Sequence, residues 1–148
     1  GEVRLMGAYI IKYQDIVKDE AGNVVEIHCT ADLETGNGNP ADGRKIKGTI
    51  HWLSAKYAID ATVRLYDYLF TLENVNDVPE GTNYMDYLNP NSLTELTGCK
   101  LEPSIADAKP GDKFQFVRMG YFCKDSKNEG VFNQIVTLKD TWAKVNKE

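Results

Sequence analysis

The chain has 148 residues, enough for one domain or two small ones, and folding at this length buries roughly 68–70% of the unfolded surface. Its 42% hydrophobic and 26% charged residues are ordinary for a globular protein, and no apolar run approaches the ~18 residues of a membrane span. The formal net charge of -5 argues against non-specific binding to phosphate, but it leaves room for a local basic patch that reads a few exposed bases.

Cysteine and histidine are too few to suggest a metal site. Cys29, Cys99 and Cys123 are odd in number and form no C-x-x-C pair, which predicts free thiols in a reducing, cytoplasmic compartment. The two histidines, His28 and His51, add little, so we predict no metal ligands. The chain does not begin with Met and has no basic-then-apolar leader, and we therefore expect a piece of a longer protein.

The first third of the chain alternates apolar and polar residues. Residues 3–13 predict one strand, and Ala21-Gly22-Asn23 predicts a turn into a returning strand over 24–30. Residues 35–43 (TGNGNPADG) are rich in Gly, Asn and Pro and predict a long loop. This part of the chain therefore predicts a hairpin followed by a loop.

The middle of the chain alternates strands with polar segments. Strands are predicted at 49–53 and 61–70, followed by a loop over 74–84 that contains Pro79-Glu80-Gly81. Short helices are predicted at 84–88 and at 91–96, where a serine has a glutamate three residues on, the spacing of a capping box.

The last third predicts a turn at 109–112, a strand-like stretch over 114–123 and a final strand over 131–138. Many short strands with at most one or two short helices predict an all-β sandwich or barrel.

Motifs of catalysis are missing from the sequence. It carries no phosphate-binding loop, dinucleotide fingerprint, nucleophile elbow or H-E-x-x-H. None of its 22 acidic residues stands out as half of a general acid and base pair, and His51 in an aromatic strand is more typical of a packing residue. We therefore predict no catalytic residues here and look instead for recognition chemistry.

The stretch FQFVRMGYFC, residues 114–123, sets four aromatic rings around Gln115 and Arg118. Uracil presents one N–H between two carbonyls, so a Gln carboxamide can accept from the N–H while an Arg guanidinium donates to a carbonyl. The rings would offer a splayed base a stacking surface, as in single-stranded RNA recognition. The alternative is an arginine that pairs with a carboxylate or lies along a ring. A regular strand would point residues three apart to opposite faces, so a shared site requires a bulge or bend near Gly120.

Six stretches, in a fixed order and spacing, resemble the C-terminal, anticodon-binding region of the glutaminyl-tRNA synthetases, which are class I aminoacyl-tRNA synthetases. The resemblance covers nearly the whole chain. It implies two β-barrels of the ribosomal-protein-like anticodon-binding type, with residues 1–48 and 125–148 in the first and an inserted second barrel at 49–124. The stretches are VRLMGAYIIK (3–12), DGRKIKGTIHWLSAKYA (42–58), VRLYDYLF (63–70), NPNSL (89–93), EPSIADAKPGDKFQFVRMGYFC (102–123) and VFNQIVTLKDTWAKV (131–145).

The resemblance also implies an activity that lies outside this chain. A parent enzyme would join glutamine to its tRNA with ATP and Mg²⁺ in an N-terminal catalytic domain, and this chain alone would hold no cofactor. Its partners would be the anticodon loop of the glutamine tRNA and the catalytic domain of the same parent chain. Two alternatives stay open: the related glutamyl-tRNA synthetase of the archaeal and eukaryotic type, and a non-enzymatic β-barrel that binds protein or sugar.

The family's base readers map onto three residues of this sequence. The resemblance implies that Gln115 and Arg118 read the middle anticodon base, a uracil, and that Arg4 reads the first base. Met6 stands where the family has a second arginine, so only one of the family's two arginine contacts to the first base is kept. Lys139 matches an arginine of the family, and we expect it to contact RNA.

The remaining candidates for RNA contact are basic residues in and after the predicted loop, namely Arg44, Lys45 and Lys47. They could form a local basic patch, and the alternative is a solvated loop.

Overall fold

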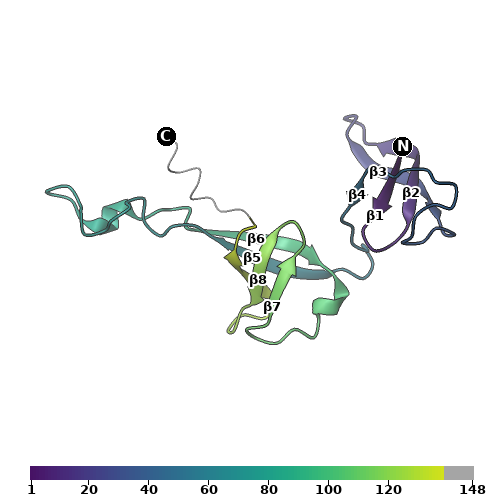
Figure 1. Cartoon of the computed structure of the whole chain (residues 1–148). Coiled ribbons are helices and arrows are strands. Elements are labelled where there is room, and N and C mark those ends of the chain that lie inside the picture. Colours follow the sequence, from purple (N-terminus) through teal and green to yellow (C-terminus); the bar gives the residue numbers. More distant parts are fainter. Residues whose placement is uncertain (139–148) are drawn as a thin grey trace. The chain divides into compact units, whose positions relative to one another are not determined.

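The regular elements are nine strands and two short 3-10 helices in the computed structural model, which describes residues 1–138. The predicted all-β class is confirmed. The chain forms two compact units, Gly1–Leu53 and the part from Ser54 onward, and each contains its own sheet (Figure 1). Across residues 1–138 both sheets are open, because the two outer strands of each do not pair with one another.

The first unit is a four-stranded sheet in the order β3-β2-β1-β4, in which β1 and β4 are parallel and the other pairs antiparallel. Ile10, at the start of β2, is 1% exposed, while most of β3 is exposed. The strands are β1 (Glu2–Leu5), β2 (Ile10–Lys18), β3 (Val24–Asp32) and β4 (Thr49–Ile50).

The single strand predicted over 3–13 is wrong, because β1 and β2 form a tight hairpin there. The N–H of Ala8 donates to the carbonyl of Leu5 at 3.0 Å, and Gly7 between them has φ 69°. A left-handed φ suits glycine, which has no Cβ to clash. Apolar alternation continues on both sides of this short turn, so periodicity alone did not reveal it.

The second predicted hairpin is confirmed. β2 pairs with β3 across a turn in which the N–H of Gly22 donates to the carbonyl of Asp19 at 3.0 Å. The predicted loop over 35–43 is also confirmed, and it lies between β3 and β4.

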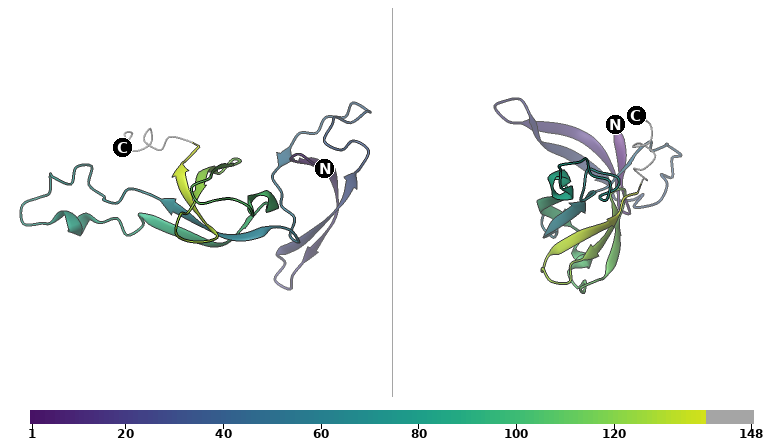
Figure 2. Two further views of the ribbon diagram at one scale, coloured as in Figure 1. Left: turned by 90° about the horizontal axis from the view of Figure 1, so that it is seen from below. Right: turned by 90° about the vertical axis from the view of Figure 1, so that its left-hand side faces the viewer.

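The second unit is a five-stranded sheet in the order β6-β5-β9-β8-β7, with β5 and β9 parallel. Between β5 and β6 a long excursion leaves the sheet and carries the helix η1 (Figures 1 and 2). The elements are β5 (Ile59–Tyr66), η1 (Tyr84–Tyr87), β6 (Leu93–Leu101), η2 (Pro103–Ile105), β7 (Lys113–Phe116), β8 (Gly120–Lys124) and β9 (Val131–Val136).

Of the two predicted short helices, the first is confirmed as η1 and the second is wrong. Residues 93–96 belong to β6, where Glu95 lies opposite Arg64 of β5 with Nε and Oε1 3.4 Å apart. The capping box lies instead before η1, where Asn83 accepts from the N–H of Met85 and Asp86 accepts from the N–H of Asn83. The long-range pairing of β6 with β5 outweighs the local capping signal at residues 91–96, and a strand forms instead of a helix.

Strand β9 lies in the second sheet, between β5 and β8. The division implied by the resemblance, with 1–48 and 125–148 in a first barrel and 49–124 in a second, stays a prediction. Val63 pairs with Phe132, and Tyr121 pairs with Val136. Phe132 is 4% exposed, so the core of this unit covers the apolar face of the strand. Residues 139–148 lie outside the described part of the chain.

The core of the second unit is built on aromatic side chains. The rings of Phe116 and Phe122 stack with centroids 4.5 Å apart, and Phe114 meets Phe132 edge-on at 6.1 Å. Fully burying one such side chain stabilises a fold by about 1.5–3 kcal/mol. These contacts attach the β7–β8 hairpin to the rest of the sheet. The buried cluster is Ala61, Val63, Ile105, Phe122 and Phe132.

Candidate nucleic-acid interface

The stretch FQFVRMGYFC folds as the β7–β8 hairpin. β7 pairs antiparallel with β8, and residues 117–119 form the turn between them. The N–H of Met119 donates to the carbonyl of Phe116 at 2.8 Å and closes this turn.

The hairpin has an inner aromatic face and an outer polar face. Phe114 and Phe116 pack against the core, and Gln115 between them is exposed, as alternation along a strand requires. Our expectation that the surrounding rings offer a stacking surface is wrong for Phe114, Phe116 and Phe122, because all three belong to the core. Tyr121 is the exception at 41% exposed, and it lies directly opposite Gln115.

Arg118 occupies the middle of the turn with φ 66°, the one non-glycine residue of the described chain with a positive φ. Such a conformation costs about 1–3 kcal/mol, and conformations of this kind cluster at functional sites. Because β7 ends at Phe116, the alternation rule that separates Gln115 from Arg118 stops applying. The structure therefore supplies the required bend as a hairpin turn, and both polar side chains are exposed at this end of the hairpin.

Gly120, which follows the turn, is required by its surroundings. Its φ is 151°, and a Cβ at this position would lie 3.1 Å from the carbonyl oxygen of Val136 and 3.3 Å from the Phe122 ring. The backbones of β8 and β9 approach so closely here that a residue without a Cβ fits best after the hairpin turn.

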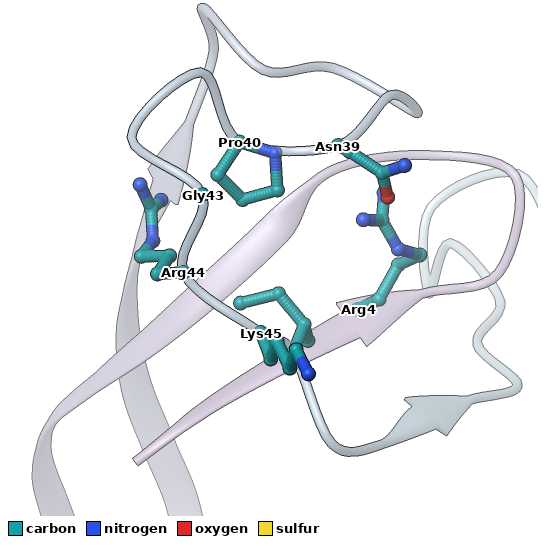
Figure 3. Close-up of a pocket in the computed structure, with 7 residues that line it drawn as sticks. Arg4, Asn39, Pro40, Gly43, Arg44 and Lys45 are labelled. Atoms are coloured by element: carbon teal, nitrogen blue, oxygen red, sulfur yellow. The ribbon is translucent and has the colours of Figure 1, made fainter.

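A second cluster of polar side chains lies in the first unit, around a pocket of about 530 Å³. β1 contributes Arg4, and the loop between β3 and β4 contributes the other residues. Arg4 and Asn39 point toward one another, while Arg44 points away from them (Figure 3). The lining residues are Arg4, Asn39, Pro40, Gly43, Arg44, Lys45 and Ile46.

The guanidinium of Arg4 is incompletely satisfied. Its Nη1 is buried and has no hydrogen-bond partner within residues 1–138. Buried polar atoms are nearly always paired in proteins, and Arg4 Nη1 is one of two side-chain exceptions among residues 1–138. The sequence pointed to Arg4 but gave no sign of Asn39, which reaches the pocket through the fold of its loop.

Arg44 is held by three carboxylates. Its nitrogens lie 3.1 Å from Glu2, 2.5 Å from Asp32 and 2.7 Å from Asp42. The cluster ties the loop to β1 and β3 and balances the charge of Arg44 within the unit. Lys45 and Lys47, on either side of Ile46, are exposed, so their ammonium groups are the positive charges that this loop presents at the surface.

The same cluster lowers the pKa of Asp32. The backbone N–H and the hydroxyl of Thr35 donate to its carboxylate at 3.0 and 2.7 Å, and with Arg44 they lower the pKa of Asp32 from 3.8 to about 2. The backbone N–H and guanidinium of Arg44 also lower the pKa of Asp42. Both carboxylates therefore favour the folded loop when ionised.

We expect the loop to lose stability in acid. A carboxylate with a lowered folded pKa stabilises the fold fully above its unfolded pKa, and this contribution disappears as the pH falls from about 4 to about 2. Urea midpoints measured at pH 7, 4 and 2.5 should fall over that window, and Asp32→Asn should flatten the fall. Glu34→Gln, which changes an exposed carboxylate of the same loop, is the control. Equal acid sensitivity in Asp32→Asn and wild type would contradict this assignment.

The predicted site residues thus fall into two groups, one in each unit. Arg4, Arg44 and Lys45 line the pocket of the first unit, and Gln115 and Arg118 share the hairpin of the second. Lys139 lies outside the described residues. No three His, Cys, Asp or Glu side chains gather to hold a metal ion among residues 1–138. In that same part of the chain, no helix is long and apolar enough to cross a membrane.

Exposed cations and a carboxamide on a β-sheet framework are typical of one class of protein, the readers of single-stranded nucleic acid, which recognise base edges with such groups. Comparison with protein families agrees. The family described as "tRNA synthetases class I (E and Q), anti-codon binding domain" matches residues 1–32 with one of its models and 49–125 with another. The chain belongs to this family of anticodon-binding domains.

Individual relatives are similar over nearly the whole chain. A glutamine–tRNA ligase of Azotobacter vinelandii is 49% identical over 96% of the chain and 26% of the relative. That of Pseudomonas aeruginosa is 47% identical over the same shares, and that of Rhodopirellula baltica is 48% identical over 98% of the chain and 24% of the relative. The chain spans about a quarter of the length of the curated relatives it matches.

Proposed function

We propose that this chain is the anticodon-binding portion of a glutamine–tRNA ligase and that its β7–β8 hairpin reads the middle anticodon base. The observation that carries the proposal is the hairpin itself, which exposes the Gln115 carboxamide on its outer face and holds Arg118 in a left-handed turn beside it. Relatives that are 47–49% identical and named glutamine–tRNA ligase support the choice of glutamine over glutamate.

Two side chains are enough to distinguish uracil from cytosine at this position. The Gln115 carboxamide accepts from the uracil N3–H, and the Arg118 guanidinium donates to a flanking carbonyl. Cytosine has no hydrogen on N3, so it would lose the Gln115 contact, and its amino group at position 4 would also oppose an Arg118 guanidinium that donates to O4. Arg4, on β1, would donate to the first anticodon base, and Lys45, Lys47 and Lys139 would contact the RNA backbone.

In the proposed parent enzyme, the attachment of glutamine to tRNA would take place in a different domain. Glutamine, ATP and Mg²⁺ would bind in a catalytic domain outside this chain, in the cytoplasm, and the present residues would hold the tRNA in position. Arg44, which is neutralised by three carboxylates, would fix the loop that carries Lys45 and Lys47.

Arg118→Ala is expected to weaken binding of a glutamine-anticodon stem-loop by about 1–3 kcal/mol and to remove its preference for uracil at the middle position. The measurement is fluorescence anisotropy at fixed low salt with the full-length protein, using the uracil loop and a loop with cytosine in its place.

Lys113→Ala is the matched control, because it removes an exposed cation from the same strand two residues from Gln115. It should change the affinity for both loops alike. Equal losses for the two loops in Arg118→Ala would overturn the base-reading role, and charging of tRNA with glutamate instead of glutamine by the parent would overturn the choice of amino acid.

A further inference from the structure

We propose that Tyr121 is the stacking platform for the base whose edge Gln115 and Arg118 read. The proposal rests on the proposed function and adds to it a residue that sets affinity for the base face. Of the four rings in FQFVRMGYFC, three are packed in the core, and Tyr121 alone is exposed, at 41%.

The sheet register places Tyr121 beside the base reader. Gln115 and Tyr121 are directly opposed in the antiparallel β7–β8 pair, so their side chains leave the same face of the sheet. Opposed Cβ atoms of this kind lie about 4.5–5.5 Å apart. A flat base laid on the Tyr121 ring would therefore present its edge to the Gln115 carboxamide.

The surroundings of Tyr121 favour an aromatic ligand. On its other side Tyr121 pairs with Val136, which is also exposed, so an apolar surface continues from the ring across to β9. Gln115 lies on the outer face of β7, and its carboxamide supplies a polar group at the edge of this apolar surface. A ligand with an apolar face and a hydrogen-bonding edge matches that arrangement, and a nucleobase has both.

Irregular backbone concentrates around Tyr121. Arg118 and Gly120 both have positive φ, and the β8–β9 register shifts between Tyr121 and Phe122. Register shifts of this kind re-aim side chains and recur next to functional sites. The aromatic pair Phe116 and Phe122 beneath the sheet holds the hairpin in place, so the Tyr121 ring is presented on a rigid support.

The test uses the full-length protein and three fluorescent anticodon stem-loops, with uracil, cytosine or an abasic residue at the middle position. Since stacking on an aromatic residue contributes about 1–3 kcal/mol per base, Tyr121→Ala should raise the Kd of the uracil loop by about 5- to 150-fold. It should leave the Kd of the abasic loop unchanged. Tyr121→Phe keeps the ring and should stay within about threefold of wild type.

Two further variants separate loss of stacking from loss of fold. Tyr57→Ala removes a tyrosine that is 62% exposed outside the strands of the same unit and should leave all three Kd values unchanged. Tyr121→Leu keeps apolar bulk on the sheet but has no aromatic face, and it should lose affinity for the uracil loop as Tyr121→Ala does. An unchanged uracil Kd in Tyr121→Ala, or equal weakening of the uracil and abasic loops, would overturn the stacking role. If wild type itself showed no preference for uracil over cytosine, the proposed function would fail, and the stacking role with it.

Discussion

Phe122→Ala is expected to lower the free energy of unfolding by about 3–5 kcal/mol, because it empties a site at the centre of an aromatic core. Phe122 is 3% exposed and stacks on Phe116 at 4.5 Å, and it belongs to the buried cluster that includes Phe132. Its loss removes both the transfer free energy of the ring and the contacts that hold β7 and β8 on the sheet. Urea titration followed by circular dichroism measures the change.

Phe70→Ala is the matched control for this prediction. Phe70 meets Tyr84 edge-on at 5.9 Å in the excursion between β5 and β6, where it is only half-buried. The same chemical change there should cost clearly less than at Phe122. Comparable losses at the two positions would show that the Phe116–Phe122 stack does not organise the core of the second unit.

Gly120→Ala is expected to destabilise the second unit by about 1–3 kcal/mol from backbone strain alone, since alanine rarely adopts a φ of 151°. The crowding adds to this cost. The new methyl group would lie 3.1 Å from the carbonyl oxygen of Val136, and β9 would have to move away from β8 to admit it. Denaturant midpoints of the variant and of wild type measure the effect.

Gly98→Ala separates the cost of backbone strain from the cost of crowding by the added methyl group. Gly98 also has a positive φ, 68°, and it lies in β6 of the same sheet, but a Cβ there would meet no atom within 4 Å. It should show the strain without the crowding and therefore lose less stability than Gly120→Ala. Equal losses would mean that the close approach of β8 and β9 contributes nothing. Because Gly120 adjoins the turn that carries Arg118, Gly120→Ala should also weaken recognition of the middle base.

Local chemistry explains why several elements were predictable from the sequence. The turn at Gly22, the loop over 35–43 and the turn at Gly111 depend on residues that tolerate positive φ or interrupt regular structure, and these signals act within a few residues. Gln115 lies outward between two half-buried phenylalanines that pack on the core, because side chains alternate along a strand. The resemblance identified the family because it rests on the order of six long stretches rather than on one short motif.

Long-range contacts decided the features that the sequence left open or predicted wrongly. Residues 91–96 carry a helix-start signal, yet pairing with β5 makes their second half a strand. β9 pairs with β5, a strand far from it in the chain, and so its sheet could not be assigned from local pattern. Arg44 looked like a free cation until the fold brought Glu2 and Asp32 to it.

By itself, the sequence determined that this is an all-β chain of the anticodon-binding family and singled out polar residues as candidate base readers, since residue type and short-range alternation are local properties. Only the tertiary structure decided where these residues lie and what surrounds them. It closed the turn that carries Arg118, placed Tyr121 opposite Gln115, and paired Arg44 with three carboxylates, while Nη1 of Arg4 has no partner within residues 1–138. These outcomes depend on strand register and loop closure, which bring together residues that are distant in the chain.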